Sequence, residues 1–279
     1  MISNVKRAFR QVDVFTTEPY RGNPLAVVLD GEDLSGAQMQ SFANWANLSE
    51  TTFVLPASDQ RADYQVRIFT PVAELAFAGH PTLGTCHAWL EAGGHPANSG
   101  SVTQQCGAGL VEVRQGSRGL AFRAPPLVRS GKVEDAVLRD VLVAFGIARS
   151  QVVEAQWADN GPGWVALLLD NTEAVLALRP GLTSHFVGVA AAYPPGSPCA
   201  FEVRAFFPKG GQMVEDPVTG SFNASLAQWL IAAGRAEAPY VASQGTALGR
   251  LGRVQVSVAD GAVWVGGSAV TCITGHVEI

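Results

Sequence analysis

Apolar residues along the chain fall mostly in short runs, with segments rich in Gly, Pro, Asn and Asp between them. Runs of this length, rich in Val, Leu, Ile and Phe, predict β-strands. In the first half, strands are predicted at residues 12–15, 25–29, 51–55, 64–69, 110–113 and 120–122. Longer segments with helical periodicity predict helices at residues 36–46, with Ser35 as the N-cap, and at residues 81–90. The pattern is that of an α+β protein with few helices.

The second half of the chain repeats the motifs of the first half. VRxFxP occurs at residues 66–71 and again at residues 203–208, and GNPLAVVLD (residues 22–30) has a looser counterpart in GPGWVALLLD (residues 161–170). GHPTLGTCHAWLEAG begins at Gly79, and GSFNASLAQWLIAAG of the same length begins at Gly220. The three matches occur in the same order in both halves and are separated by nearly the same number of residues. This favours a duplicated unit over chance similarity.

The duplication predicts two small α+β domains, each with a β-barrel-like sheet around a central helix. The helices, residues 81–90 and 224–233, are apolar on nearly all sides, as buried helices are. We place the first domain at residues 1–126, together with a last strand at about 263–279, and the second at residues 127–262. The linker candidate is RAPPLVRSGK, residues 123–132. Both helix N-termini are expected to point into a cleft between the domains.

Composition limits the classes of function. The chain has 279 residues, 47% of them hydrophobic, and a net charge of −5 without a basic cluster, which argues against nucleic-acid binding. The N-terminus lacks the apolar stretch of a signal peptide, and no apolar run is long enough to span a bilayer. Four scattered cysteines without a CxxC pair favour reduced thiols and argue against a zinc site. We therefore expect a cytoplasmic protein that contacts no membrane.

The two glycine-led helix starts are candidate anion sites. A helix N-terminus presents free N–H groups and a partial positive charge, and glycine lets a ligand approach the backbone closely. Gly79 and Gly220 begin the two segments, and Pro81 in the first turn sacrifices no hydrogen bond. The alternative is ordinary capping of these helices by side chains, for which the candidates are Thr82, Ser221 and Asn223.

Three titratable residues stand out beside these helix starts. Glu50 lies between a predicted helix and a predicted strand, on a face shared with apolar residues, where a carboxyl group suits general acid or base catalysis; the alternative is a surface glutamate. Asp216 precedes Pro217 shortly before Gly220 and could equally cap a turn. His80 directly follows Gly79, and its alternative role is that of a packed histidine bonded to the backbone.

Taken together, these motifs resemble the phenazine-biosynthesis (PhzF-like) isomerase family. The resemblance covers nearly the whole chain, and its carriers are DVFT, GNPLAVV, NLSETTFV, VRIFTP, ELAFAGHPTLGT and EDPVTGS. It implies the diaminopimelate-epimerase-like fold, with two pseudo-symmetric domains and the active site in their cleft. It also implies a homodimer and a cofactor-independent isomerisation of a dihydroanthranilate-like carboxylate.

By the resemblance, each site residue receives a role. Glu50 would be the proton shuttle, while His80, Asp216 and Ser221 would orient the substrate and assist the transfer. The backbone donors for the substrate carboxylate would come from Gly79 and Gly220.

Related thiol-dependent racemases carry a cysteine before each helix-starting glycine, where this chain has Ala78 and Thr219. The second half has no carboxylate that corresponds to Glu50. A single proton shuttle is therefore favoured. Two alternatives stay open, a metabolite-binding protein without turnover and a racemase or epimerase of a small acid.

Overall fold

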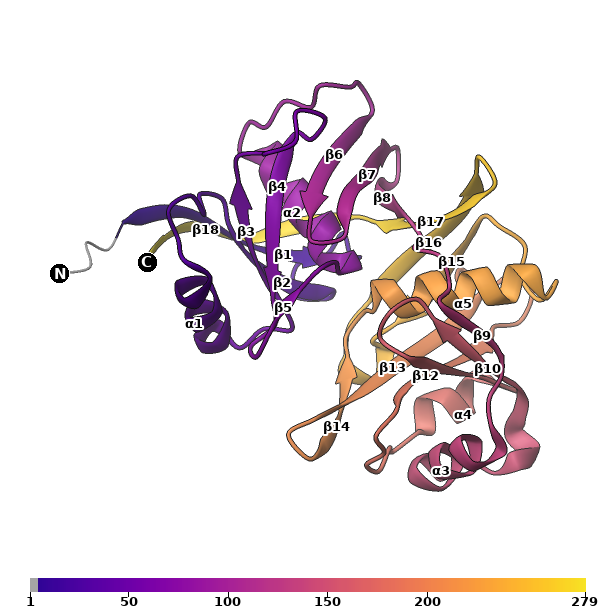
Figure 1. The fold of residues 1–279 in the computed structure, drawn as a ribbon. Helices are drawn as coiled ribbons and strands as arrows, with labels where there is room; N and C mark the ends of the chain where they lie inside the picture. The colour runs from indigo at the N-terminus through magenta and orange to yellow at the C-terminus, as the bar shows by residue number, and fades with distance from the viewer. Residues whose placement is uncertain (1–4) are drawn as a thin grey trace. The chain divides into compact units, whose positions relative to one another are not determined.

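A computed structural model describes residues 5–279, which form two compact units (Figure 1). Unit 1 comprises the described part of Met1–Arg123 together with Gly266–Ile279, and unit 2 comprises Ala124–Val265. Each unit has its own buried helix. Within residues 5–279, we find no helix that is both long enough and apolar enough to cross a membrane.

Unit 1 is a mixed sheet that wraps around one helix. Its strands are β1 (Lys6–Val14), β2 (Asn23–Val28), β3 (Thr51–Leu55), β4 (Tyr64–Phe69), β5 (Glu74–Leu75), β6 (Ser101–Cys106), β7 (Gly109–Gly116), β8 (Gly119–Arg123) and β18 (Ala269–Glu278). β1 pairs antiparallel with β18 and β2, β2 pairs parallel with β3, and β4 pairs antiparallel with β3 and β5. β6 then pairs parallel with β4 and antiparallel with β7, which pairs with β8.

Two helices complete unit 1, and their surroundings differ. α1 (Gly36–Ala46) begins with a reciprocal cap, in which the Gln38 amide donates to Ser35 Oγ and the Ser35 amide donates to Gln38 Oε1. It ends at Asn47 in the left-handed conformation, and the chain then runs directly to Glu50. α2 (Gly79–Glu91) is buried from Gly79 through Cys86 and packs against strands on several sides.

Unit 2 repeats this topology strand for strand. Its elements are β9 (Arg129–Lys132), α3 (Asp135–Phe145), a short 3-10 helix (Arg149–Gln151), β10 (Val152–Asp159), β11 (Trp164–Leu169), α4 (Thr172–Ala177), β12 (Phe186–Ala192), β13 (Phe201–Lys209), β14 (Gln212–Asp216), α5 (Gly220–Ala232), β15 (Tyr240–Gln244), a 3-10 turn (Thr246–Leu248), β16 (Gly252–Ala259) and β17 (Ala262–Gly267). Strand pairing in unit 2 follows the same sequence of antiparallel and parallel neighbours as in unit 1. β10 pairs antiparallel with β11, β11 parallel with β12, and β12 antiparallel with β13. β13 then pairs antiparallel with β14 and parallel with β15, which pairs antiparallel with β16.

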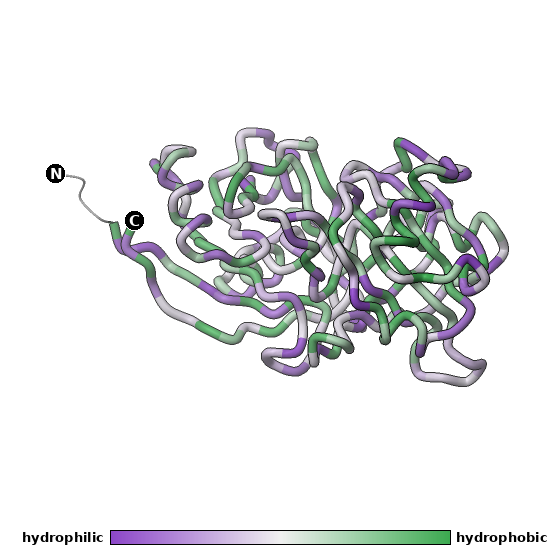
Figure 2. The backbone as a smooth tube through the Cα atoms, turned by 90° about the horizontal axis from the view of Figure 1, so that it is seen from below, coloured by the Kyte–Doolittle hydropathy of each residue, from purple (hydrophilic) through white to green (hydrophobic). Residues whose placement is uncertain are grey.

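Packing in unit 2 follows from its apolar strands. All six residues of β11 are buried, and α5 buries residues on every side, including Phe222, Leu226 and Leu230. A strand at the surface behaves differently: β18 exposes part of its length, and the chain near both ends alternates polar and apolar residues (Figure 2). The predicted α+β class, with a sheet around a central apolar helix in each of two units, is confirmed.

Several boundaries differ from the prediction. Both central helices begin earlier than expected, α2 at Gly79 and α5 at Gly220, so each glycine is the first residue of its helix. The segment predicted as a linker, residues 123–132, ends in strand β9, which pairs with β10. β1 begins well before the predicted residues 12–15 because its half-buried first half pairs with β18.

Candidate active site

The start of α2 carries two of the predicted site residues. Gly79 and His80 are its first two residues, and both are buried. The N-cap is Ala78 in an extended conformation, and no side chain within the described chain caps this end. Capping by Thr82 is therefore wrong. The helix thus begins without a side-chain cap, at a point where the helix dipole favours an anion.

Glu50 lies beside His80. Its Oε2 is 3.5 Å from His80 Nε2, and the two side chains are 17% and 5% exposed. The alternative of a solvent-exposed glutamate is wrong. Strand β3, which begins directly after Glu50, is tied to α2 because Thr85 Oγ1 donates to Thr52 Oγ1 at 2.8 Å. This hydrogen bond holds the strand that follows Glu50 against α2.

The imidazole of His80 is neutral. Burial lowers its pKa to about 3, against which a hydrogen bond to the backbone of Pro24 has a smaller, opposite effect. The ring is also held by Asn23, whose Nδ2 is 3.5 Å from His80 Nδ1. A neutral imidazole lies beside the carboxyl group without adding a positive charge to it. In this pair Glu50 is therefore the group suited to exchange a proton with a ligand.

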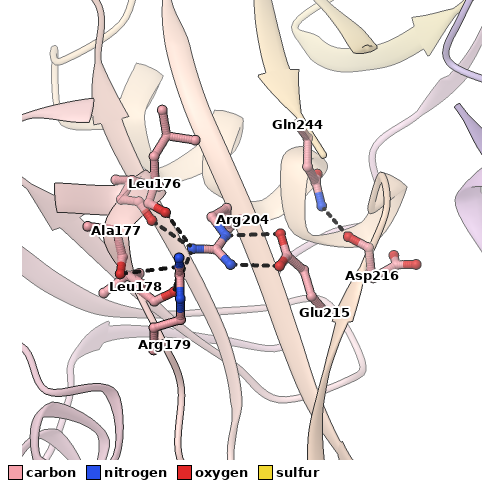
Figure 3. Close-up of polar contacts among 9 residues, drawn as sticks. Leu176, Ala177, Leu178, Arg179, Arg204, Glu215, Asp216 and Gln244 are labelled. Carbon is pink, nitrogen blue, oxygen red and sulfur yellow. Dashed lines mark hydrogen bonds and ion pairs between the residues drawn. The ribbon is translucent and has the colours of Figure 1, made fainter. Parts of the chain in front are cut away.

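Asp216 is the last residue of β14 in unit 2. Its carboxylate accepts a hydrogen bond from Thr219 Oγ1 at 2.6 Å, and its carbonyl accepts one from Gln244 Nε2 at 3.2 Å (Figure 3). Gln244 is fully buried and also accepts from the Thr219 amide and from Asn223 Nδ2 through its Oε1. This buried amide fixes the whole turn between β14 and α5.

Gly220 and Ser221 begin α5. Ser221 Oγ accepts a hydrogen bond from Trp164 Nε1 at 3.2 Å, and the Ser221 carbonyl accepts one from Asn160 Nδ2 at 2.9 Å. The N-cap is Thr219, and within residues 5–279 no side chain caps this helix either. Capping by Ser221 or Asn223 is therefore wrong. Asn223 instead donates to Gln244 and to the Thr219 carbonyl.

The structure groups the predicted residues by unit. Glu50, His80 and Gly79 lie together in unit 1, and Asp216 with the Gly220–Ser221 helix start lies in unit 2. The two helix starts match in a further respect that the sequence did not suggest. The first residue of β2, Asn23, contacts the second residue of α2, and the first residue of β11, Trp164, contacts the second residue of α5.

Sequence reasoning missed Asn23, Trp164 and Gln244. The repeat could have indicated the first two, since GNPLAVVLD and GPGWVALLLD were already aligned. Gln244 lies in a strand without a motif, and only the fold brings it to β14.

No thiol occupies the place that cysteine-dependent racemases use. The N-cap positions hold Ala78 and Thr219, and the four cysteines are free thiols elsewhere. Within the described residues, no three His, Cys, Asp or Glu side chains gather closely enough to hold a metal ion.

The fold is shared with solved proteins of the PhzF family. The crystal structure of a phenazine biosynthesis protein of the PhzF family from Bacillus anthracis has the same fold, with a TM-score of 0.80 at 21% identity over 99% of this chain and 100% of that one.

The chain belongs to the PhzC-PhzF family of phenazine biosynthesis-like proteins, whose sequence profile matches residues 12–275. It is 38% identical to the trans-2,3-dihydro-3-hydroxyanthranilate isomerase of Pseudomonas fluorescens, over 86% of each chain. It is 36% identical to the antisense-enhancing sequence 1 protein of Schizosaccharomyces pombe, over 97% of this chain and 98% of that one. The predicted family is thus confirmed, and with it the enzyme class of isomerase.

Proposed function

We propose that this protein is a cofactor-independent isomerase that moves a proton on a small carboxylated, dihydroanthranilate-like substrate, with Glu50 as the proton carrier. The observation that carries the proposal is the Glu50–His80 pair at the uncapped start of α2, in which the imidazole is neutral. The 38% identity to a trans-2,3-dihydro-3-hydroxyanthranilate isomerase supports this substrate class.

In the proposed reaction, Glu50 enters as a carboxylate and removes a proton from one carbon of an allylic system. The electron pair of the broken C–H bond forms a new C=C bond, and the former C=C pair takes the proton back from the Glu50 carboxylic acid at the far carbon. Glu50 is then a carboxylate again, and the substrate has only shifted its double bond. An enol formed in this way becomes a ketone. His80 keeps Glu50 oriented between the two proton transfers.

Binding in this proposal depends on the helix starts. In unit 1, the start of α2 at Gly79 favours a carboxylate even though the chain carries a net charge of −5. In unit 2, the start of α5 at Gly220 has the same preference, and Ser221 Oγ and Asp216 offer a hydroxyl group and a carboxylate to polar groups of a ligand. Both are held by neighbours, Trp164 and Thr219. Positions fixed in this way favour catalysis because little reorganisation is needed.

The test is turnover of trans-2,3-dihydro-3-hydroxyanthranilate by the purified wild type and by Glu50→Gln. Because general acid–base catalysis is worth about 10²–10⁴-fold, we expect kcat to fall by that factor in Glu50→Gln with a small change in KM. Glu74→Gln is the matched control, since this glutamate of unit 1 is paired with Arg67 away from His80. A Glu50→Gln variant as active as the Glu74→Gln variant would contradict the role of Glu50.

A binding protein without turnover gives a different result. In that case, thermal stabilisation by the carboxylate persists in Glu50→Gln, and the wild type converts no compound in a screen of cyclic and linear carboxylates. We extend the proposal to a homodimer in the cytoplasm. Sedimentation equilibrium of the purified protein checks the dimer.

A further inference from the structure

A buried ion pair lies next to Asp216 and has no place in the reaction proposed above. Arg204 on β13 holds Glu215 on β14 through two parallel hydrogen bonds, Nε to Oε1 at 2.9 Å and the second guanidinium nitrogen to Oε2 at 2.7 Å. The side chains are only 4% and 10% exposed. The third nitrogen of Arg204 donates to the carbonyls of Val175, Leu176 and Leu178 at the end of α4 (Figure 3).

Each of the three nitrogens of the guanidinium thus donates at least one hydrogen bond. A buried charge is tolerated only when it is paired and hydrogen bonded, and the last carbonyls of a helix lack partners within the helix and favour a cation. The Phe206 ring also faces the guanidinium, with Arg204 Cζ 4.9 Å from its centroid. Arg204 thus joins β13, β14 and the C-terminus of α4 at one point.

Glu215 is the residue directly before Asp216. Neighbouring residues of a strand point to opposite faces, so fixing Glu215 on one face sets the direction of Asp216 on the other. On β13 the two residues pair with Phe206 and Ala205. Asp216 is therefore held from both sides along the chain, by the ion pair before it and by Gln244 and Thr219 after it.

Unit 1 contains the same pair without a neighbouring acid. Arg67 donates to both oxygens of Glu74 at 2.7 Å, and Glu74 precedes Gly79 by five residues, as Glu215 precedes Gly220. This copy is 28% and 43% exposed, and the residue after Glu74 is Leu75. Of the two Arg–Glu pairs, only the one in unit 2, which Asp216 follows, is buried.

We infer that Arg204 and Glu215 are positioning residues, which hold Asp216 in the orientation that the isomerisation requires. This inference rests on the proposed function. A displacement of about 1 Å in a reacting group costs about 100-fold in rate, so loss of the pair should lower kcat. Because the pair does not touch the substrate, KM should change little.

The experiment compares two double variants with the wild type and with Asp216→Asn. Arg204→Met/Glu215→Leu replaces the buried pair with apolar groups of similar size, which buried ion pairs commonly tolerate without loss of stability. We expect a cooperative unfolding transition, a kcat reduced by about 10- to 100-fold and an unchanged KM. Arg67→Met/Glu74→Leu is the matched control and should keep the wild-type kcat. Arg204→Lys, which keeps the charge but loses the two-pronged contact, should lower kcat by a smaller factor.

Three results would overturn the inference. A folded Arg204→Met/Glu215→Leu or Arg204→Lys enzyme with wild-type kcat, beside an inactive Asp216→Asn, would refute the positioning role and leave the proposed function intact. Equal losses of kcat in the Arg204 and Arg67 double variants would show a general effect of the pair on stability. Absence of turnover in the wild type itself would refute the proposed function, and the inference would fall with it.

Discussion

The neutral state of His80 predicts how the stability of unit 1 depends on pH. Its ordinary pKa is 6.5, and burial lowers the value in the folded protein to about 3. Between these values the unfolded chain binds a proton that the folded chain does not, so stability falls as pH falls. The contribution is fully present above about pH 6.5, declines by about 1.4 kcal/mol per pH unit below it, and stops declining near pH 3.

Between pH 7 and pH 5 this amounts to about 2 kcal/mol for the single side chain. This loss of stability depends mainly on the pKa of His80 in the unfolded chain. Any pKa below about 4 in the folded protein gives nearly the same loss of stability between pH 7 and pH 5. His80→Gln removes the titrating group while keeping a polar side chain of similar reach. We therefore expect the wild type to lose about 2 kcal/mol more than His80→Gln between the two pH values.

Urea unfolding at pH 7 and pH 5, followed by circular dichroism and tryptophan fluorescence, measures this difference. His87, whose pKa burial also lowers, contributes equally to both proteins and cancels. Glu50 faces His80, so the comparison is repeated in a Glu50→Gln background to separate the carboxyl group from the imidazole. Equal losses in the wild type and His80→Gln, or an NMR titration of His80 near pH 6.5, would refute a buried neutral imidazole.

Three further predictions concern packing, capping and thiols. Gly188→Ala should lower the free energy of unfolding by about 1–3 kcal/mol, because an added Cβ would lie 2.0 Å from the buried Phe222 ring; Gly275→Ala, with no heavy atom within 4 Å, is the control in urea melts. Ser35→Ala should cost about 1 kcal/mol in the same assay through loss of the α1 cap, whereas Ser197→Ala at an exposed turn should not. Alkylation with iodoacetamide should leave turnover unchanged because Ala78 and Thr219 stand at the helix starts; inactivation protected by substrate would contradict this.

The sequence predicted the elements that carry their own local signals. α1 was placed correctly because Ser35 and Gln38 form its cap. β3 and β4 were placed correctly because both are short runs rich in β-branched and aromatic residues. The starts of α2 and α5 were placed too late because neither has a side-chain cap to announce it.

Contacts between distant segments left no such signal. Glu50 and His80 lie close together because β3, which follows Glu50, is hydrogen bonded to α2 through Thr52 and Thr85. The ion pair of Arg204 and Glu215 was likewise hidden, although VRxFxP had marked Arg204 as part of the repeat. Local pattern therefore gave the candidate residues, and the long-range pairing of strands decided which of them meet.

The central claim is that Glu50 carries a proton between two carbons of the substrate, and solvent labelling tests it most directly. In D₂O, with the product analysed by NMR and mass spectrometry, the wild type should place solvent deuterium on the carbon that receives the proton. Glu50→Gln should form no labelled product while still binding substrate, and Glu74→Gln should label as the wild type does. Labelled product formed by Glu50→Gln at the wild-type rate would contradict the account.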